Sequence, residues 1–188
     1  QWDAMKTYLD ILARKELAVD QELWLIQKYL DSGHHQPAET KLASFQERHP
    51  DDSRGLLLDA WLEMMRGNLE VSLTKTQRYL EQDTNSAGGW RLKGRIHRLM
   101  DQPQQAIDAL QRSKSITPDS SVRMELATLY SQSRQIEAAA GELNTGLTDP
   151  KAPQQLRLML ETLYRENKRY NDLKTFYTKT LEKFPEDT

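Results

Sequence analysis

The chain has 188 residues, 37% of them hydrophobic and 29% charged, with a net charge of −2 and a pI near 6.1. This composition suits a folded, charge-rich domain, and its charge balance disfavours binding to nucleic acid or anionic membranes. The absence of cysteine excludes disulfides, thiolate nucleophiles and cysteine-ligated zinc. No apolar run approaches the ~18–20 residues of a membrane-spanning helix, so we expect no membrane span.

Three prolines set a period along the chain. Pro50, Pro118 and Pro185 lie 68 and 67 residues apart, close to two 34-residue periods each time. A 34-residue period is the length of a helix–turn–helix unit that is copied along a chain, each copy burying its apolar face against the next. Helices of roughly 12–15 residues are barely stable alone in water, so packing between them must supply most of the stability.

The first residues precede a complete unit. Each repeat consists of a first helix, helix A, and a second helix, helix B. Residues 1–18 are expected to be helix B of a truncated preceding repeat, with Ala4 and Tyr8 on that helix. The chain begins with Gln1 rather than methionine, which indicates a removed leader or a piece of a longer protein.

Two units follow, over residues 19–52 and 53–86. The first places Ala38 at position 20 of its unit, and Pro50 falls at position 32. The second unit places small residues at positions 8 and 20, which are Ala60 and Ser72. Thr84 replaces the expected proline, so the turn after the second unit is less firmly specified.

Three more units complete the chain, over residues 87–119, 120–153 and 154–188. The residues that define the third unit are Trp90, Gly94, Ala106 and Pro118, at positions 4, 8, 20 and 32. The fourth unit fits one residue early, with Ala127 and Ala139 at positions 8 and 20. The fifth unit is the most degenerate, because Glu161 and Leu173 occupy those two positions.

This pattern resembles the tetratricopeptide repeat (TPR), which has an aromatic residue at position 4, small residues at 8 and 20, and proline at 32. Small residues suit positions 8 and 20 because helix A crosses helix B there, and proline ends helix B. The resemblance implies an all-α fold, a right-handed superhelical α-solenoid of antiparallel helix pairs.

The resemblance also implies a partner-binding concave groove, lined by helix A through positions 2, 5, 9, 12 and 13. The candidate partner-binding residues are Leu57, Trp61, Met64, Met65, Arg91, Arg95, Arg98 and Met124. The remaining units add Leu23, Gln27, Leu30, Thr128, Ser131, Gln132, Leu158, Thr162 and Arg165.

Two interpretations of these groove residues stay open. In the functional one, the arginines bond carboxylates of a protein or peptide segment that is acidic and carries an apolar anchor. In the other, the arginines form a solvated face that pairs with neighbouring carboxylates, and Trp61 and the methionines pack between units.

The sequence offers little for catalysis. It contains no phosphate-binding loop, nucleophile elbow or metalloprotease motif, so we predict no enzyme, no cofactor and no metal. His34, His35 and His49 fall at predicted turns or helix ends and are expected to be exposed, whereas His97 replaces an aromatic residue and is expected to pack. Because arrays that bind single-stranded RNA are expected to be basic, nucleic acid is not an expected partner.

The sequence therefore predicts a non-catalytic scaffold for protein–protein interaction. The alternative is an assembly module that forms a homo-oligomer through uncapped ends, in bacterial envelope, secretion or polysaccharide-export machinery. The composition resembles that of bacterial TPR proteins, for which both the periplasm and the cytoplasm remain open.

Overall fold

The structure is a computed structural model that describes residues 17–149 and 151–183. Pro150, Pro185 and residues 1–16 of the helix expected over residues 1–18 lie outside this described part, and residues 17 and 18 are not helical. Within it, every regular element is an α-helix, so the all-α prediction is confirmed. The helices are α2 (Val19–Asp31), α3 (His35–Arg48), α4 (Ser53–Met65), α5 (Leu69–Gln82), α6 (Ala87–Leu99), α7 (Pro103–Ile116), α8 (Ser120–Gln132), α9 (Ile136–Gly146), α10 (Gln154–Glu166) and α11 (Tyr170–Lys183).

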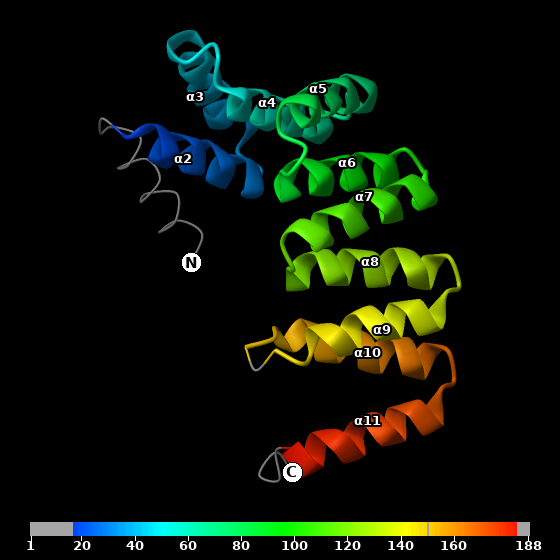
Figure 1. Ribbon diagram of the computed structural model, residues 1–188. Helices are drawn as coiled ribbons and strands as arrows, with labels where there is room; N and C mark the ends of the chain where they lie inside the picture. The colour runs from blue at the N-terminus through cyan, green and yellow to red at the C-terminus, as the bar shows by residue number, and fades with distance from the viewer. Residues whose placement is uncertain (1–16, 150, 184–188) are drawn as a thin grey trace. The chain divides into compact units, whose positions relative to one another are not determined.

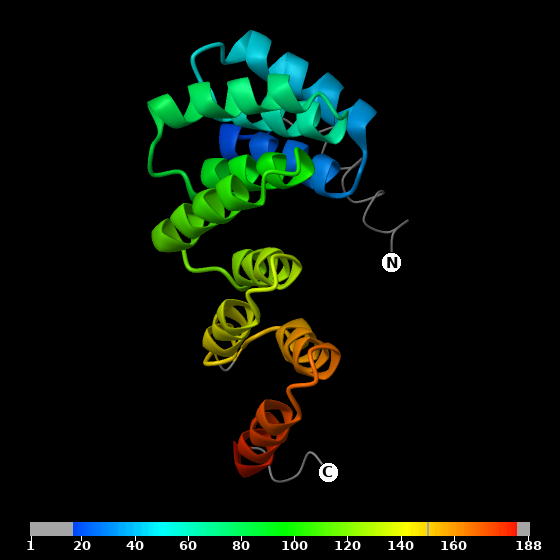
Figure 2. The same ribbon diagram turned by 90° about the vertical axis from the view of Figure 1, so that its right-hand side faces the viewer.

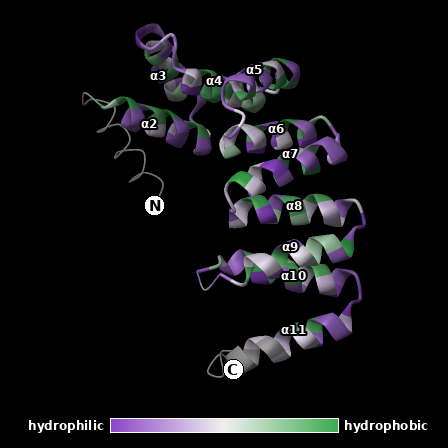
Figure 3. Ribbon diagram, viewed as in Figure 1, coloured by the Kyte–Doolittle hydropathy of each residue, from purple (hydrophilic) through white to green (hydrophobic). Residues whose placement is uncertain are grey.

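The chain forms two compact units, residues 1–101 and 102–188. Within the described part, the first unit holds α2 to α6 and the second holds α7 to α11. Inside each unit, helices that follow one another in the chain pack side by side (Figures 1 and 2). Figure 3 shows hydrophobic and hydrophilic residues alternating around the helices, as short amphipathic helices require. The right-handed superhelix stays a prediction.

A left-handed residue ends the first helix of each helix pair. Gly33 after α2 has φ +73° and Gly67 after α4 has φ +84°. The equivalent residues after α6, α8 and α10 are Asp101, Arg134 and Lys168, with φ +57°, +60° and +57°. This conformation lets the following amide reach back to the helix, as when the N–H of residue 135 donates to the Tyr130 carbonyl at 2.8 Å. The turn is therefore the same whether or not glycine occupies it.

Small residues let paired helices approach closely. The Ser72 hydroxyl of α5 donates to the Ala60 carbonyl of α4 at 2.6 Å, and Ser72 is fully buried. In the second unit, Ala127 on α8 and Ala139 on α9 are 2% and 0% exposed and belong to one core cluster. A glycine does the same between α5 and α6, since a Cβ on Gly89 would lie 2.8 Å from a methyl group of Leu80.

Each unit buries its own core. In the first unit the largest fully buried side chain is Phe45, which packs with Leu25, Ile26 and Leu30 across α2 and α3. A second cluster joins α4 to α6 through Ala60, Met64, Leu92 and Ile96. In the second unit one cluster runs from α7 to α10. No helix in the described ranges has the length and hydrophobicity to cross a bilayer.

Candidate functional site

Two of the predicted groove residues meet in the first unit. The Arg95 guanidinium carbon of α6 lies 5.1 Å from the centre of the Trp61 ring of α4, within cation–π range. Trp61 is partly buried and packs against both core clusters of this unit, so its ring is held in place. The core therefore positions an aromatic surface on which an arginine rests.

The two adjacent methionines of α4 separate. Met65 is 42% exposed, whereas Met64 is 8% exposed and packs in the cluster with Leu92 and Ile96. Successive residues on a helix point about 100° apart, so only one of the two can face α6. Met64 is therefore a core residue, and we remove it from the candidate partner-binding set. Leu57 also packs on this cluster but stays partly exposed.

The remaining predicted arginines lie on the same helix as Arg95. Arg91 is half-buried and Arg98 is exposed. Leu99, which the sequence did not single out, is 51% exposed beside them. Leu99 stands at position 13 of the third repeat, residues 87–119, which is a groove position. The repeat pattern could therefore have identified it. We give the name α4/α6 face to the following set of residues: Leu57, Trp61, Met65, Arg91, Arg95, Arg98 and Leu99.

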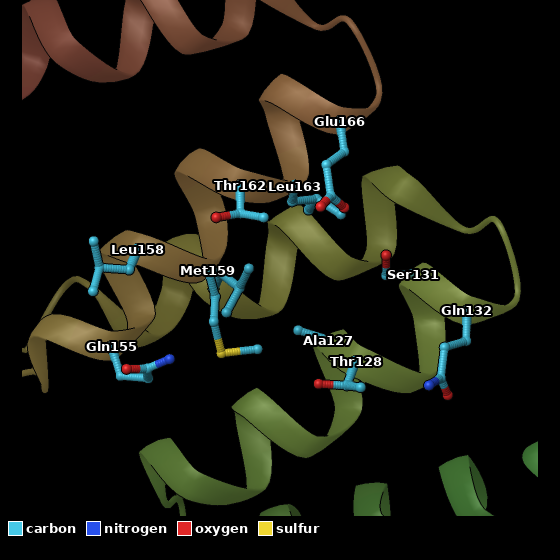
Figure 4. A pocket seen from close by; sticks show the side chains of 11 residues that line it. Ala127, Thr128, Ser131, Gln132, Gln155, Leu158, Met159, Thr162, Leu163 and Glu166 are labelled. Carbon is cyan, nitrogen blue, oxygen red and sulfur yellow. The ribbon is translucent and has the colours of Figure 1, made fainter.

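A hollow of about 400 Å³ lies between α8 and α10 in the second unit (Figure 4). We call it the α8/α10 hollow. Its lining residues are Ala127, Thr128, Ser131, Gln132, Leu143, Gln155, Leu158, Met159, Thr162, Leu163 and Glu166. The structure thus brings together five residues that the sequence placed on helix A groove positions of the last two units.

Two other groove candidates of this unit lie elsewhere. Met124 is half-buried against the unit's core and does not line the hollow. Arg165 forms an ion pair with Glu161, one turn earlier on the same helix. The apolar residues Ala127, Leu143, Met159 and Leu163 line the hollow from positions outside the groove pattern. In α2, the candidates Leu23 and Leu30 are buried in the core.

A second hollow, of about 740 Å³, lies at the turn between α3 and α4 and is lined mostly by charged and polar residues. Arg54 lies 2.6 Å from both Asp52 and Asp20, and the Asp52 side chain also caps α4 by accepting from the amide of residue 54. These hydrogen bonds from Arg54 hold the pKa of Asp52 below its ordinary value. Because these charges pair with one another, we interpret them as holding the start of α4 in place.

The histidines show no metal-binding arrangement. His97 is buried, as predicted, whereas His34, His35 and His49 are half-buried and not exposed as expected. The His49 ring packs against Phe45 with ring centres 4.9 Å apart. His34 lies at the start of α3, where its Nδ1 is 3.0 Å from the carbonyl of residue 32. No group of three or more metal-ligating side chains gathers anywhere in the described ranges.

The helix pairs, their left-handed turns and their close crossings define a helical-repeat protein. No protein-family model matches the sequence, and no curated protein matches it significantly. Solved structures do match. TTC0263, a thermophilic TPR protein of Thermus thermophilus, is 19% identical over 90% of this chain and 93% of that one, with a TM-score of 0.66.

Two further structures show the same similarity. MamA from Desulfovibrio magneticus RS-1 is 16% identical, covering 90% of this chain and 97% of that one with a TM-score of 0.65. A structure of Naa15/Naa10 bound to HypK-THB is 16% identical and has a TM-score of 0.70, covering 87% of this chain and 25% of that one. The chain therefore has the tetratricopeptide-repeat fold.

Proposed function

We propose that the protein is a non-catalytic scaffold that binds a segment of a partner protein on the exposed faces of its A helices. The observation that carries this proposal is the Arg95 guanidinium resting on the Trp61 ring, with exposed Met65 and Leu99 on the same two helices. Tryptophan and arginine dominate the energy of protein interfaces, and methionine adapts to different partner shapes. One of the similar structures is itself a complex with another protein, which supports a binding role.

The chemistry of the α4/α6 face favours a partner segment that is acidic and carries an apolar anchor. Arg91, Arg95 and Arg98 lie at spacings of four and three along α6, so their positive charges share one side of the helix. A guanidinium already stacked on a ring loses little freedom when it bonds a carboxylate with its two parallel N–H groups. Met124 remains a candidate of the same kind in the second unit.

A peptide selection tests the proposal. Random twelve-residue peptides displayed on phage would be selected against the full chain, and the enriched peptides would be synthesised and titrated by fluorescence anisotropy. We expect acidic peptides with an apolar residue, whose affinity Arg95→Glu lowers at least about fivefold.

The matched control is Arg78→Glu, which makes the same charge change at an exposed position of α5 in the same unit. Helicity and melting temperature should be nearly unchanged in both variants, because neither side chain is buried. Equal loss of affinity in the two variants would show that net charge causes the effect. It would contradict the α4/α6 face as the binding site.

One observation favours the alternative of self-assembly. Tyr170 and Tyr177 are 62% and 41% exposed and lie seven residues apart, on one face of α11. A second copy of the chain could cover this face. A bacterial setting, in the envelope or in the cytoplasm, remains part of this proposal.

A further inference from the structure

The α8/α10 hollow differs in charge from the α4/α6 face. Its lining holds one ionisable side chain, Glu166, and no basic residue. Glu166 lies on the last turn of α10, at the same end of the hollow as Gln132 on the last turn of α8 (Figure 4). The C-terminal ends of two helices carry partial negative charge, which adds to the carboxylate. This end of the hollow therefore favours a cation.

Neutral polar groups surround the rest of the hollow. The amides of Gln132 and Gln155 and the hydroxyl of Ser131 make no hydrogen bond to other groups of the described chain. A glutamine amide both donates and accepts, so it can pair with either group of a peptide backbone. Thr128 differs, because its hydroxyl already donates to the carbonyl of residue 124 at 2.8 Å. Main-chain recognition therefore falls to Ser131, Thr162 and the two glutamines.

The floor of the hollow is apolar. Ala127, Leu143 and Leu163 belong to the core of the unit, and Met159 packs against that core with its sulfur directed into the hollow (Figure 4). Leu158 is 47% exposed at the rim. A volume of about 400 Å³ lies at the small end of the range for ligand pockets, roughly 300–1,000 Å³.

We infer that the α8/α10 hollow binds an extended protein segment that inserts an aliphatic side chain against Met159 and places a lysine or arginine beside Glu166. The inference rests on the proposed scaffold function and names the partner chemistry for the second unit. Charge complementarity favours this occupant, since an acidic segment would meet Glu166 with no basic residue among those that line the hollow. The two units thus take segments of opposite charge.

Selection against the full chain should also enrich a second class of peptide, with an aliphatic residue and a nearby lysine, and a synthetic member of this class is the probe. We expect Thr162→Trp, which fills the hollow from an exposed helix position, to lower its affinity at least about tenfold. The matched control Thr145→Trp, exposed on α9, should leave the affinity unchanged. Circular dichroism checks that each variant stays folded.

Charge reversal tests the second half of the inference. Glu166→Lys should weaken the lysine peptide at least about threefold and strengthen the same peptide with glutamate in place of lysine. Glu81→Lys, exposed on α5, is the control for net charge.

The outcomes separate the inference from the proposed function. Loss with Thr162→Trp but none with Glu166→Lys would overturn the charge preference. Enriched peptides that respond to Arg95→Glu and ignore Thr162→Trp would overturn the inference and leave the scaffold function standing. If no peptide is enriched, or none responds to either variant, both fall.

Discussion

Arg134 and Lys168 occupy a turn position that favours glycine. Their φ values of +60° and +57° lie in the left-handed region, where a side chain costs on the order of 1 kcal/mol. Asp101, at the end of the first unit, has the same conformation with φ +57°, whereas Gly33 and Gly67 avoid this cost. The three turns without glycine therefore keep a geometry that the helix pair imposes, at the expense of local strain.

Replacing Arg134 by glycine should stabilise the chain. The gain from relieving the left-handed strain exceeds the extra backbone entropy of glycine in the unfolded chain, leaving about 0.5–1 kcal/mol. We expect the thermal midpoint to rise by about 2–3 °C in calorimetry. Lys168→Gly should act in the same direction, since both side chains are exposed.

The control for this change is Gly67→Ala. An added Cβ at Gly67 meets no atom within 4 Å, so any effect comes from the φ of +84° alone. We expect destabilisation by about 1 kcal/mol. A stabilising result there, or no gain in Arg134→Gly, would show that the turn relaxes away from the left-handed conformation.

At the scale of helices, Glu63 joins the end of α4 to α5. Its carboxylate accepts from the Asn68 amide at 2.6 Å and from Arg66 at 3.2 Å, and it lies 3.9 Å from the Lys75 ammonium. The hydrogen bond from Asn68, followed by the charge of Lys75, holds the pKa of Glu63 below its ordinary 4.5. Ionised Glu63 therefore stabilises the folded state.

This shift predicts a pH dependence with a definite sign. A carboxyl group with a lowered pKa in the folded state stabilises it fully above the unfolded pKa, and the contribution is lost as pH falls through the folded pKa. We expect Glu63→Gln to lower the urea midpoint at about pH 7 and to differ less from wild type at about pH 3. Exposed Glu70→Gln, on α5, should change neither midpoint. A constant difference at both pH values would assign the effect of Glu63 to packing.

The sequence predicts these helices well at positions where the close approach of two backbones limits the size of the side chain. Ala60 and Ser72 identify a crossing that the structure closes to a 2.6 Å hydrogen bond, because only small side chains allow that approach. Met64 shows the limit. Its groove position implied exposure, but its burial depends on how α6 packs against α4. The residue type cannot show this packing, because exposed Met65 is also a methionine.

The candidate site was predictable to a similar depth. A separation of 34 residues placed Trp61 and Arg95 at equal positions of adjacent units, but the stacking itself depends on side-chain conformation. The apolar floor of the α8/α10 hollow comes from residues such as Met159 and Leu163, whose positions are those of core residues. A repeat pattern assigns each position one role, whereas a hollow exposes parts of the core.

At the scale of the whole molecule, the sequence period and the packing describe two levels of organisation. A 34-residue period predicts equal units, and the division of residues 87–119 from their neighbours stays a prediction. At a coarser level, the structure forms two compact units that meet in sequence at Asp101, between α6 and α7. Sequence spacing reports how the units were copied, whereas compactness depends on which side chains each copy buries.

The area of exposed surface that a second copy could cover decides between partner binding and self-assembly. A stable interface buries about 800 Å² on each partner, whereas a tyrosine side chain contributes about 150–250 Å² when fully covered. With only 62% and 41% of their surfaces exposed, Tyr170 and Tyr177 supply too little area for a stable dimer on their own. We therefore expect light scattering to give the monomer mass of 21.9 kDa at all concentrations up to about 100 μM.

A mass that rises with concentration would contradict this expectation, and variants then locate the contact. If Tyr170→Lys and Tyr177→Lys together restored the monomer, the α11 face would be an interface and self-assembly would become the better function. If they did not, the added area would have to come from elsewhere on the chain. Because the α4/α6 face lies in the other unit, Arg95→Glu should leave an α11-mediated oligomer intact while weakening peptide binding, so the two functions separate in one pair of variants.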